Sequence, residues 1–195
     1  EIMPSLVGSE MCIRDSANTM PFTIEGKLQP GVYELEGDVS SQYVTGLILA
    51  LILLPGDSEI RMLSRLESKP YVDLTIACLR QFGAEVQETA SGYRIPGGQK
   101  LHACDQTVEG DYSQAAFFSV ANVLGSTIEL TNLNPKSVQG DKKIVEITEQ
   151  MCYNLKEGLP ACFSVDASDI PDLVPILAVL ATFGTCLLYT SDAAD

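Results

Sequence analysis

The sequence predicts a mixed α/β (α+β) fold made of repeated β-α-β-α-β-β units. The first indication is a short phrase that occurs three times, at residues 36–40 (EGDVS), 109–113 (EGDYS) and 165–168 (VDAS). Each copy leads into a run of small and apolar residues, at 44–54, 115–124 and 173–183. The turns and apolar segments after the first copy recur in the same order after the second, which indicates copies of one supersecondary unit.

The first predicted unit begins with extended segments over 23–37. Ser40, Ser41 or both can cap the helix that follows over 42–54. Proline and glycine end this helix, and a strand is predicted next, at 58–63.

A second helix of this unit has Ser68 as a candidate cap and Pro70 at its first helical position, where a missing N–H is tolerated. Apolar residues then recur at helical spacing up to Phe82, which precedes a glycine. A β-hairpin with strands at 84–88 and 92–95 completes the unit.

The second unit repeats this order. A helix is predicted after the turn at Gly110-Asp111, and residues 137–141 occupy the place that 68–73 have in the first unit. The other predicted elements are a strand at 127–130, a helix over 142–151, and two strands at 154–156 and 161–165. A third unit begins at Asp166 and breaks off soon after its helix.

The two ends of the chain, residues 1–20 and 186–195, fit no part of the repeat. We interpret residues 1–20 as foreign or disordered and residues 186–195 as a foreign tail. Ordinary frayed ends are the alternative interpretation.

The composition is that of a globular protein, with 46% hydrophobic and 19% charged residues. Its apolar runs are too short to span a bilayer, and no secretory signal is predicted. A net charge of -14 argues against nucleic-acid and anionic-membrane partners. The six cysteines include no CxxC pair and are expected to be reduced, which favours a cytoplasmic protein.

Several chemistries lack their signatures. There is one histidine, His102, and no G-x-S-x-G, so a Ser-His-Asp site has little support. Neither a P-loop nor a G-x-G-x-x-G is present. Asp166, Asp169 and Asp172 lack the alternation and glycine of a calcium loop, so no metal site is predicted.

Two helix starts are candidate anion sites. Hydroxyls and a carboxamide at Ser40-Ser41-Gln42 could hold a phosphate together with the helix dipole, and plain N-capping is the alternative. Ser68 and Tyr71, on either side of a lysine and a proline, pose the same choice. The copy at Ser113 lacks the double hydroxyl, and we expect Ser113 to be only a helix cap.

Asp172 is the candidate proton acceptor. Because Pro171 fits the first helical position, Asp172 becomes a carboxylate in the first turn, ionised and able to accept a proton. The alternative is a carboxylate that only complements the helix dipole.

Four motifs together closely resemble the 5-enolpyruvylshikimate-3-phosphate synthase family, a branch of the enolpyruvyl transferases. They are residues 37–46 (GDVSSQYVTG), 68–73 (SKPYVD), 139–141 (QGD) and 169–172 (DIPD), in the family's order and spacing, within a resemblance over about 21–183. The sister enzyme, UDP-N-acetylglucosamine enolpyruvyl transferase, shares the fold but not the Ser-Ser-Gln and Lys-Pro-Tyr pairings.

The resemblance implies transfer of the enolpyruvyl group from phosphoenolpyruvate to the 5-hydroxyl of shikimate 3-phosphate, with release of phosphate and without metal or organic cofactor. Ser40, Ser41 and Ser68 would hold the shikimate phosphate. Gln42 would lie between the two substrates and Tyr71 would contact the shikimate side, while the general base would be Asp172.

The resemblance also implies two domains of three units each in a full-length, monomeric family member. Residues 21–105 would be the last unit of the first domain, and 106–185 the first unit and the start of the next unit of the second. No arginine follows Arg94, and the family's other Lys and Arg residues have no match. We therefore expect an internal fragment that is inactive alone; a non-catalytic module that binds a phosphorylated metabolite is the alternative.

Overall fold

The computed structural model describes residues 26–156 and 164–183. The two terminal segments, 1–20 interpreted as foreign or disordered and 186–195 interpreted as a foreign tail, therefore lie outside the described residues. The chain divides into two compact units, Glu1–Asp105 and Gln106–Asp195. Each unit is described by itself.

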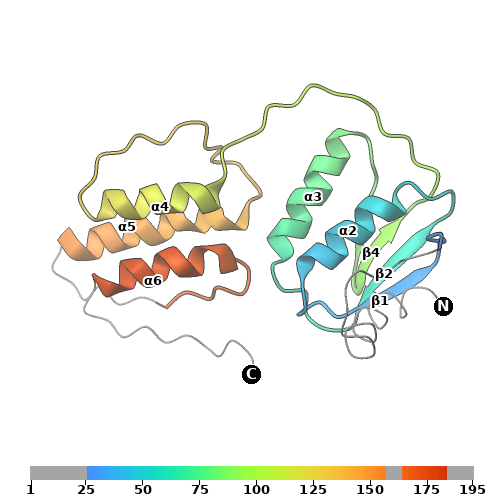
Figure 1. Cartoon of the computed structure of the whole chain (residues 1–195), viewed down its shortest axis with the longest axis horizontal. Coiled ribbons are helices and arrows are strands. Elements are labelled where there is room, and N and C mark those ends of the chain that lie inside the picture. The colour runs from blue at the N-terminus through green and yellow to red at the C-terminus, as the bar shows by residue number, and fades with distance from the viewer. Residues whose placement is uncertain (1–25, 157–163, 184–195) are drawn as a thin grey trace, which may run out of the picture. The chain divides into compact units, whose positions relative to one another are not determined.

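The first unit has the predicted element order, β-α-β-α-β-β. Its elements are β1 (Val32–Leu35), α2 (Ser41–Leu51), β2 (Ser58–Met62), α3 (Lys69–Gln81), β3 (Gln87–Thr89) and β4 (Gly92–Ile95). The sheet order is β1-β2-β4-β3, with β1 and β2 parallel and the other pairs antiparallel. Figure 1 shows α2 and α3 side by side on one face of this sheet. The mixed α/β fold class and the hairpin are confirmed.

The core of this unit lies between the sheet and its two helices. Strands β1 and β4 alternate buried and exposed positions, which is the pattern of a sheet with one covered face. The largest fully buried side chains of the unit are Tyr93, Ile48, Leu51, Ile52, Ile60, Ile95 and Val44.

Helix α2 carries apolar residues on both its sides. Its inner face is buried, and its outer face exposes Leu49, with Leu53 just beyond its end. No charged residue occurs from 41 to 53. Gly46 lies on the exposed side, where an added Cβ would meet nothing within 4 Å.

The described part of the second unit is helical. It contains α4 (Tyr112–Val123), the 3₁₀ turn Gly140–Lys142, α5 (Lys143–Lys156), the 3₁₀ turn Pro171–Leu173 and α6 (Val174–Thr182). Both α5 and α6 pack against α4 (Figure 1). The shared core includes Ile144, Met151, Ile170, Leu173 and Leu180.

Two predicted strands of this unit are wrong. Residues 127–130 form no strand, because the Asn122 side chain takes both backbone groups of Ile128: Oδ1 accepts its N–H at 2.7 Å and Nδ2 donates to its C=O at 2.8 Å. Residues 154–156 are the last turn of α5, since helical spacing of apolar residues continues to that point. Of the strand predicted at 161–165, residues 161–163 lie outside the described residues, and 164–165 are not in a strand.

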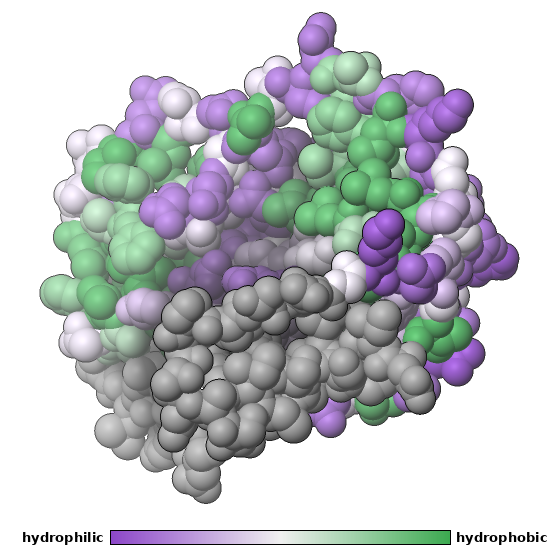
Figure 2. Space-filling view, turned by 45° about the vertical axis from the view of Figure 1, so that its right-hand side comes forward, coloured by the Kyte–Doolittle hydropathy of each residue, from purple (hydrophilic) through white to green (hydrophobic). Residues whose placement is uncertain are grey.

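Apolar side chains are also exposed on the surface, and Figure 2 shows hydrophobic surface on both units. The most exposed of them are Val108, Leu53, Phe183, Leu63 and Val39. In the described part of the chain, no helix combines the length and apolar character that crossing a membrane requires.

Candidate substrate-phosphate site

The candidate site is built at the edge where the two parallel strands of the first unit end. Since β1 and β2 run in the same direction, the loops that lead into α2 and α3 leave the sheet at the same edge. The N–H of Leu63 donates to the C=O of Leu35 at 2.8 Å and so extends the pairing to the start of both loops.

The two loops are in direct contact through Gly37. Its N–H donates to Ser64 Oγ at 2.8 Å, and its C=O accepts the N–H of Glu67 at 3.0 Å. A Cβ at position 37 would lie 2.7 Å from the C=O oxygen of Arg65. Ser64 Oγ also donates to Asp38 Oδ1 at 2.8 Å. Only glycine therefore allows the loops to approach this closely.

Ser40 caps α2, as the sequence predicts. Its backbone is extended, and its Oγ accepts the N–H of Gln42 at 3.2 Å. A serine hydroxyl that accepts a hydrogen bond can still donate its own hydrogen, so capping leaves a donor at the helix start. Gln42 is exposed, whereas Ser41 is buried as the first residue of the helix.

Ser68 does not cap α3, and that prediction is wrong. Its backbone is left-handed, with φ 55°, and its side chain makes no capping hydrogen bond. For a residue with a Cβ this conformation costs about 1–2 kcal/mol. Pro70 lies in the first turn, one position later than predicted, because α3 begins at Lys69. The first turns of α2 and α3 hold no acidic residue, so neither helix dipole is already complemented by a carboxylate there.

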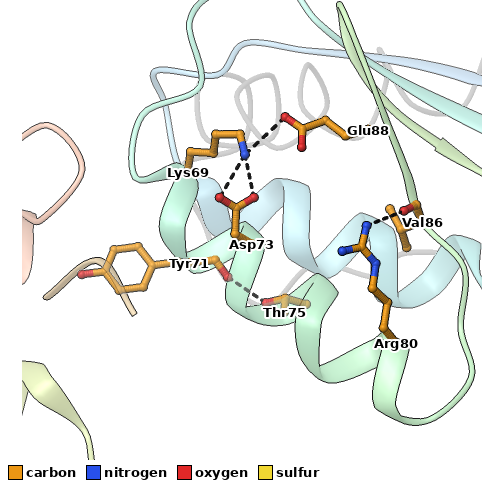
Figure 3. Close-up of polar contacts among 7 residues, drawn as sticks. All are labelled: Lys69, Tyr71, Asp73, Thr75, Arg80, Val86 and Glu88. Carbon is orange, nitrogen blue, oxygen red and sulfur yellow. Dashed lines mark hydrogen bonds and ion pairs between the residues drawn. The ribbon is translucent and has the colours of Figure 1, made fainter. Parts of the chain in front are cut away.

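Lys69 ties the start of α3 to the hairpin. Its Nζ donates to Asp73 Oδ1 at 2.7 Å and Oδ2 at 2.9 Å, and it lies 3.3 Å from Glu88 Oε1 (Figure 3). Burial is the largest single influence and would lower the pKa of Lys69. The hydrogen bonds to Asp73 and Glu88 and the nearby negative charge together outweigh it, so the pKa lies above its ordinary value. The predicted site does not include the pair of Lys69 and Asp73, although their i, i+4 spacing in the sequence is the signal of such an ion pair.

The side chains of Lys69 and Tyr71 point to different sides of the helix start (Figure 3). An open cavity of about 250 Å³ lies on the lysine side, between the loop after β2 and the β3–β4 hairpin. Its lining includes Lys69, Glu88 and Tyr93, and burial raises the pKa of Tyr93 to about 12. None of the five predicted substrate-binding residues lines it.

In the second copy of the repeated phrase the helix cap is Asp111 instead of a serine, and in the third copy Asp166 makes the same contact within a turn that caps no helix. Asp111 Oδ1 accepts the N–H of Ser113 at 2.8 Å and its hydroxyl at 2.7 Å. Asp166 Oδ1 accepts the N–H of Ser168 at 3.0 Å and its hydroxyl at 2.6 Å. The expectation that Ser113 is a cap is therefore wrong: its hydroxyl donates to the actual cap.

A hydrogen-bonded carboxylate holds the start of α4. Glu109 accepts from the Ser137 hydroxyl, from Gln139 Nε2 at 2.8 Å and from Asn134 Nδ2 at 2.7 Å. Gln139 Oε1 in turn accepts the N–H of Tyr112 at 2.9 Å. These hydrogen bonds, that of Ser137 first, hold the pKa of the Glu109 carboxyl below its ordinary value.

Asp172 lies in the 3₁₀ turn before α6, directly after Pro171, and is exposed. It belongs to the second unit, whereas the five predicted substrate-binding residues belong to the first. Within the described ranges, no group of three or more His, Cys, Asp or Glu side chains is placed to hold a metal ion.

The four-stranded sheet and the helices define a protein of the mixed α/β class. The chain matches a family model described as EPSP synthase (3-phosphoshikimate 1-carboxyvinyltransferase) over residues 5–194. It belongs to the EPSP synthase family.

Curated relatives carry the same name. A 3-phosphoshikimate 1-carboxyvinyltransferase of Clostridium novyi (strain NT) is 45% identical over 177 residues, which are 86% of this chain and 41% of the relative. That of Methanocaldococcus jannaschii is 40% identical over 177 residues, 85% of this chain and 41% of the relative. An EPSP synthase structure from Acinetobacter baumannii matches with 27% identity and a TM-score of 0.49, over 64% of this chain and 27% of that one. The chain thus spans about two fifths of the length of the curated relatives.

Proposed function

We propose that the chain is part of a 3-phosphoshikimate 1-carboxyvinyltransferase and that its first unit binds the phosphate of shikimate 3-phosphate. The observation that carries the proposal is the direct contact between the loops that lead into α2 and α3, through Gly37. It puts two helix starts, each with serine and without a first-turn acid, at one sheet edge. Such helix starts attract anions through backbone N–H groups and the helix dipole.

The residues at this edge would contribute unequally to substrate binding. Ser40 contributes a hydroxyl hydrogen and Ser68 a hydroxyl that its own helix does not use as a cap. Ser41 is buried, so its contribution should be smaller than that of Ser40. Gln42 would lie between the substrates, and Tyr71 would contact the shikimate side.

Asp172 would serve as general base. It would take the proton of the 5-hydroxyl as that oxygen bonds to C2 of phosphoenolpyruvate and the methylene carbon gains a proton. In the elimination that follows, the methyl carbon loses a proton, the double bond forms again and the bond from C2 to the phosphate oxygen breaks. Its exposed place at a helix start supports this role, because a carboxylate there can meet a substrate. The two substrates would be the only small-molecule partners, with no cofactor.

Titration calorimetry of the chain with shikimate 3-phosphate tests the phosphate site. We expect binding that Ser40→Ala or Ser68→Ala weakens, and no response to UDP-N-acetylglucosamine, the substrate of the sister enzyme. Absence of binding by the unaltered chain would contradict the proposal. Binding of the UDP-sugar instead would favour the sister activity.

Turnover tests the role of Asp172. The chain alone should be inactive, because no arginine follows Arg94 and phosphates and carboxylates need basic partners. Adding the missing segments of a relative should restore turnover, and Asp172→Asn should then lower kcat by roughly 10²–10⁴. Turnover by the chain alone would refute its inactivity, and binding that never gains activity would favour a non-catalytic module that binds a phosphorylated metabolite.

We also propose that a full-length protein of this kind acts as a monomer in the cytoplasm. In support of the location, Cys78 and Cys152 are free thiols, and reduced thiols are typical of cytosolic proteins.

A further inference from the structure

The start of α3 needs a restraint that its own cap does not supply. Ser68 has a left-handed backbone, which a residue with a Cβ adopts only when its surroundings hold it there. The helix receives no hydrogen bond from the Ser68 side chain. One backbone hydrogen bond, from the N–H of Tyr71 to the C=O of Ser68 at 3.1 Å, closes the turn.

The residue next to Ser68 supplies such a restraint. The Lys69 ammonium has three hydrogens and faces three carboxylate oxygens, two on Asp73 and one on Glu88. Asp73 lies one turn further along α3, and Glu88 lies in β3. The backbone at 68–69 is thereby tied both to its own helix and to the hairpin.

The ammonium group is directed toward the hairpin and not toward the side that Tyr71 occupies (Figure 3). Both of its partners are carboxylates, so its charge is compensated within the unit. These two facts argue against direct contact between Lys69 and a substrate that binds at Ser68 and Tyr71.

We propose that Lys69 is a positioning residue, which holds the Ser68–Tyr71 turn in the conformation that binds the phosphorylated substrate, by means of its ion pairs with Asp73 and Glu88. This inference rests on the function proposed above. The side chains of Lys69, Asp73 and Glu88 are 38%, 39% and 57% exposed, and ion pairs this exposed contribute little to global stability. Their effect should therefore be local, on the turn.

Replacement of Asp73 distinguishes a positioning role of the ion pairs from a purely electrostatic effect on anion binding. Asp73→Asn removes a negative charge near the proposed phosphate site, so a purely electrostatic role of these residues predicts equal or tighter binding of the anion. Positioning predicts weaker binding. We expect Asp73→Asn and Lys69→Met each to weaken shikimate 3-phosphate binding about tenfold in titration calorimetry, and Lys69→Arg to restore most of it.

Glu67→Gln is the matched control. It removes a carboxylate beside Ser68 and leaves the backbone contact of Glu67 with Gly37 in place. We expect unchanged or slightly tighter binding. Melting curves followed by circular dichroism should be alike for all four variants, whereas a merely structural role would lower the melting temperature together with the affinity.

Amide hydrogen exchange gives a readout that needs no ligand. In Asp73→Asn and Lys69→Met, peptides covering 68–75 should exchange faster than in the unaltered chain, and other peptides should not. Unchanged exchange in these peptides, or wild-type affinity in Asp73→Asn, would overturn the positioning role of Lys69 and leave the proposed function standing. If neither the unaltered chain nor Glu67→Gln binds shikimate 3-phosphate, the proposed function is overturned, and the positioning role of Lys69 with it.

Discussion

Gly37→Ala should separate the two loops on which the proposed phosphate site depends. The added Cβ would lie 2.7 Å from the C=O oxygen and 2.8 Å from the carbonyl carbon of Arg65, and 2.8 Å from the Cα of Leu66. All three atoms are backbone, so no side-chain rotation relieves the overlap. The two hydrogen bonds of Gly37, at 2.8 Å and 3.0 Å, must lengthen.

Overpacking costs about 1–3 kcal/mol, and each lost hydrogen bond about 1 kcal/mol, so the first unit should lose about 3 kcal/mol of stability. With a urea dependence of about 2 kcal/mol/M, the unfolding midpoint should fall by about 1.5 M. Circular dichroism can follow the transition, since the chain has no tryptophan. Hydrogen exchange at 30–40 assigns it to the first unit.

Gly46→Ala is the matched control, because an added Cβ meets nothing within 4 Å in helix α2. Alanine is favoured over glycine inside a helix by about 1 kcal/mol, so this variant should be as stable as the unaltered chain or more so. An unchanged midpoint for Gly37→Ala would refute the close approach of the loops. Loss of stability in both variants would show that the effect is not specific to Gly37.

Two further predictions concern a cap and a carboxylate. Ser40→Ala should destabilise the first unit by about 1 kcal/mol, which urea unfolding can measure. Ser40→Asp should keep the cap but abolish binding of shikimate 3-phosphate by charge repulsion, and binding retained in calorimetry would contradict the phosphate role of Ser40. The lowered pKa of Glu109 means that its ionised form stabilises the folded second unit: this contribution is complete above the ordinary pKa of 4.5 and is lost as pH falls through the lower folded-state pKa. Glu109→Gln should flatten the dependence of unfolding on pH in that range, and an unchanged slope would exclude Glu109 as its source.

The first unit could be predicted from sequence because its signals are local. Apolar spacing indicates α2 and α3, and Pro70 fixes where α3 begins. The hairpin follows from two short β-prone segments around a turn, although β3 is shorter than expected. Ser40 is a helix cap because its Oγ needs to reach only two residues along the chain.

The features that the sequence did not reveal depend on particular side-chain contacts and on a backbone conformation, which residue type and spacing do not report. The strand expected at 127–130 has suitable residues, but the Asn122 amide occupies the backbone groups of Ile128 that a ladder would need. Ser68 has the right residue type for a cap and the wrong backbone, which residue type does not report. The contact between Lys69 and Glu88 joins a helix to a hairpin, and only the fold brings them together.

The left-handed backbone of Ser68 also sets stability against function at a single position. Glycine adopts this conformation without the penalty of about 1–2 kcal/mol that a Cβ brings. A selection for thermal stability alone should therefore favour glycine at position 68, while a selection for binding of the proposed phosphorylated substrate should retain the serine hydroxyl. Variants recovered under the two selections would differ at this residue, and the difference in their free energies of unfolding would give the stability that is lost by keeping the serine hydroxyl.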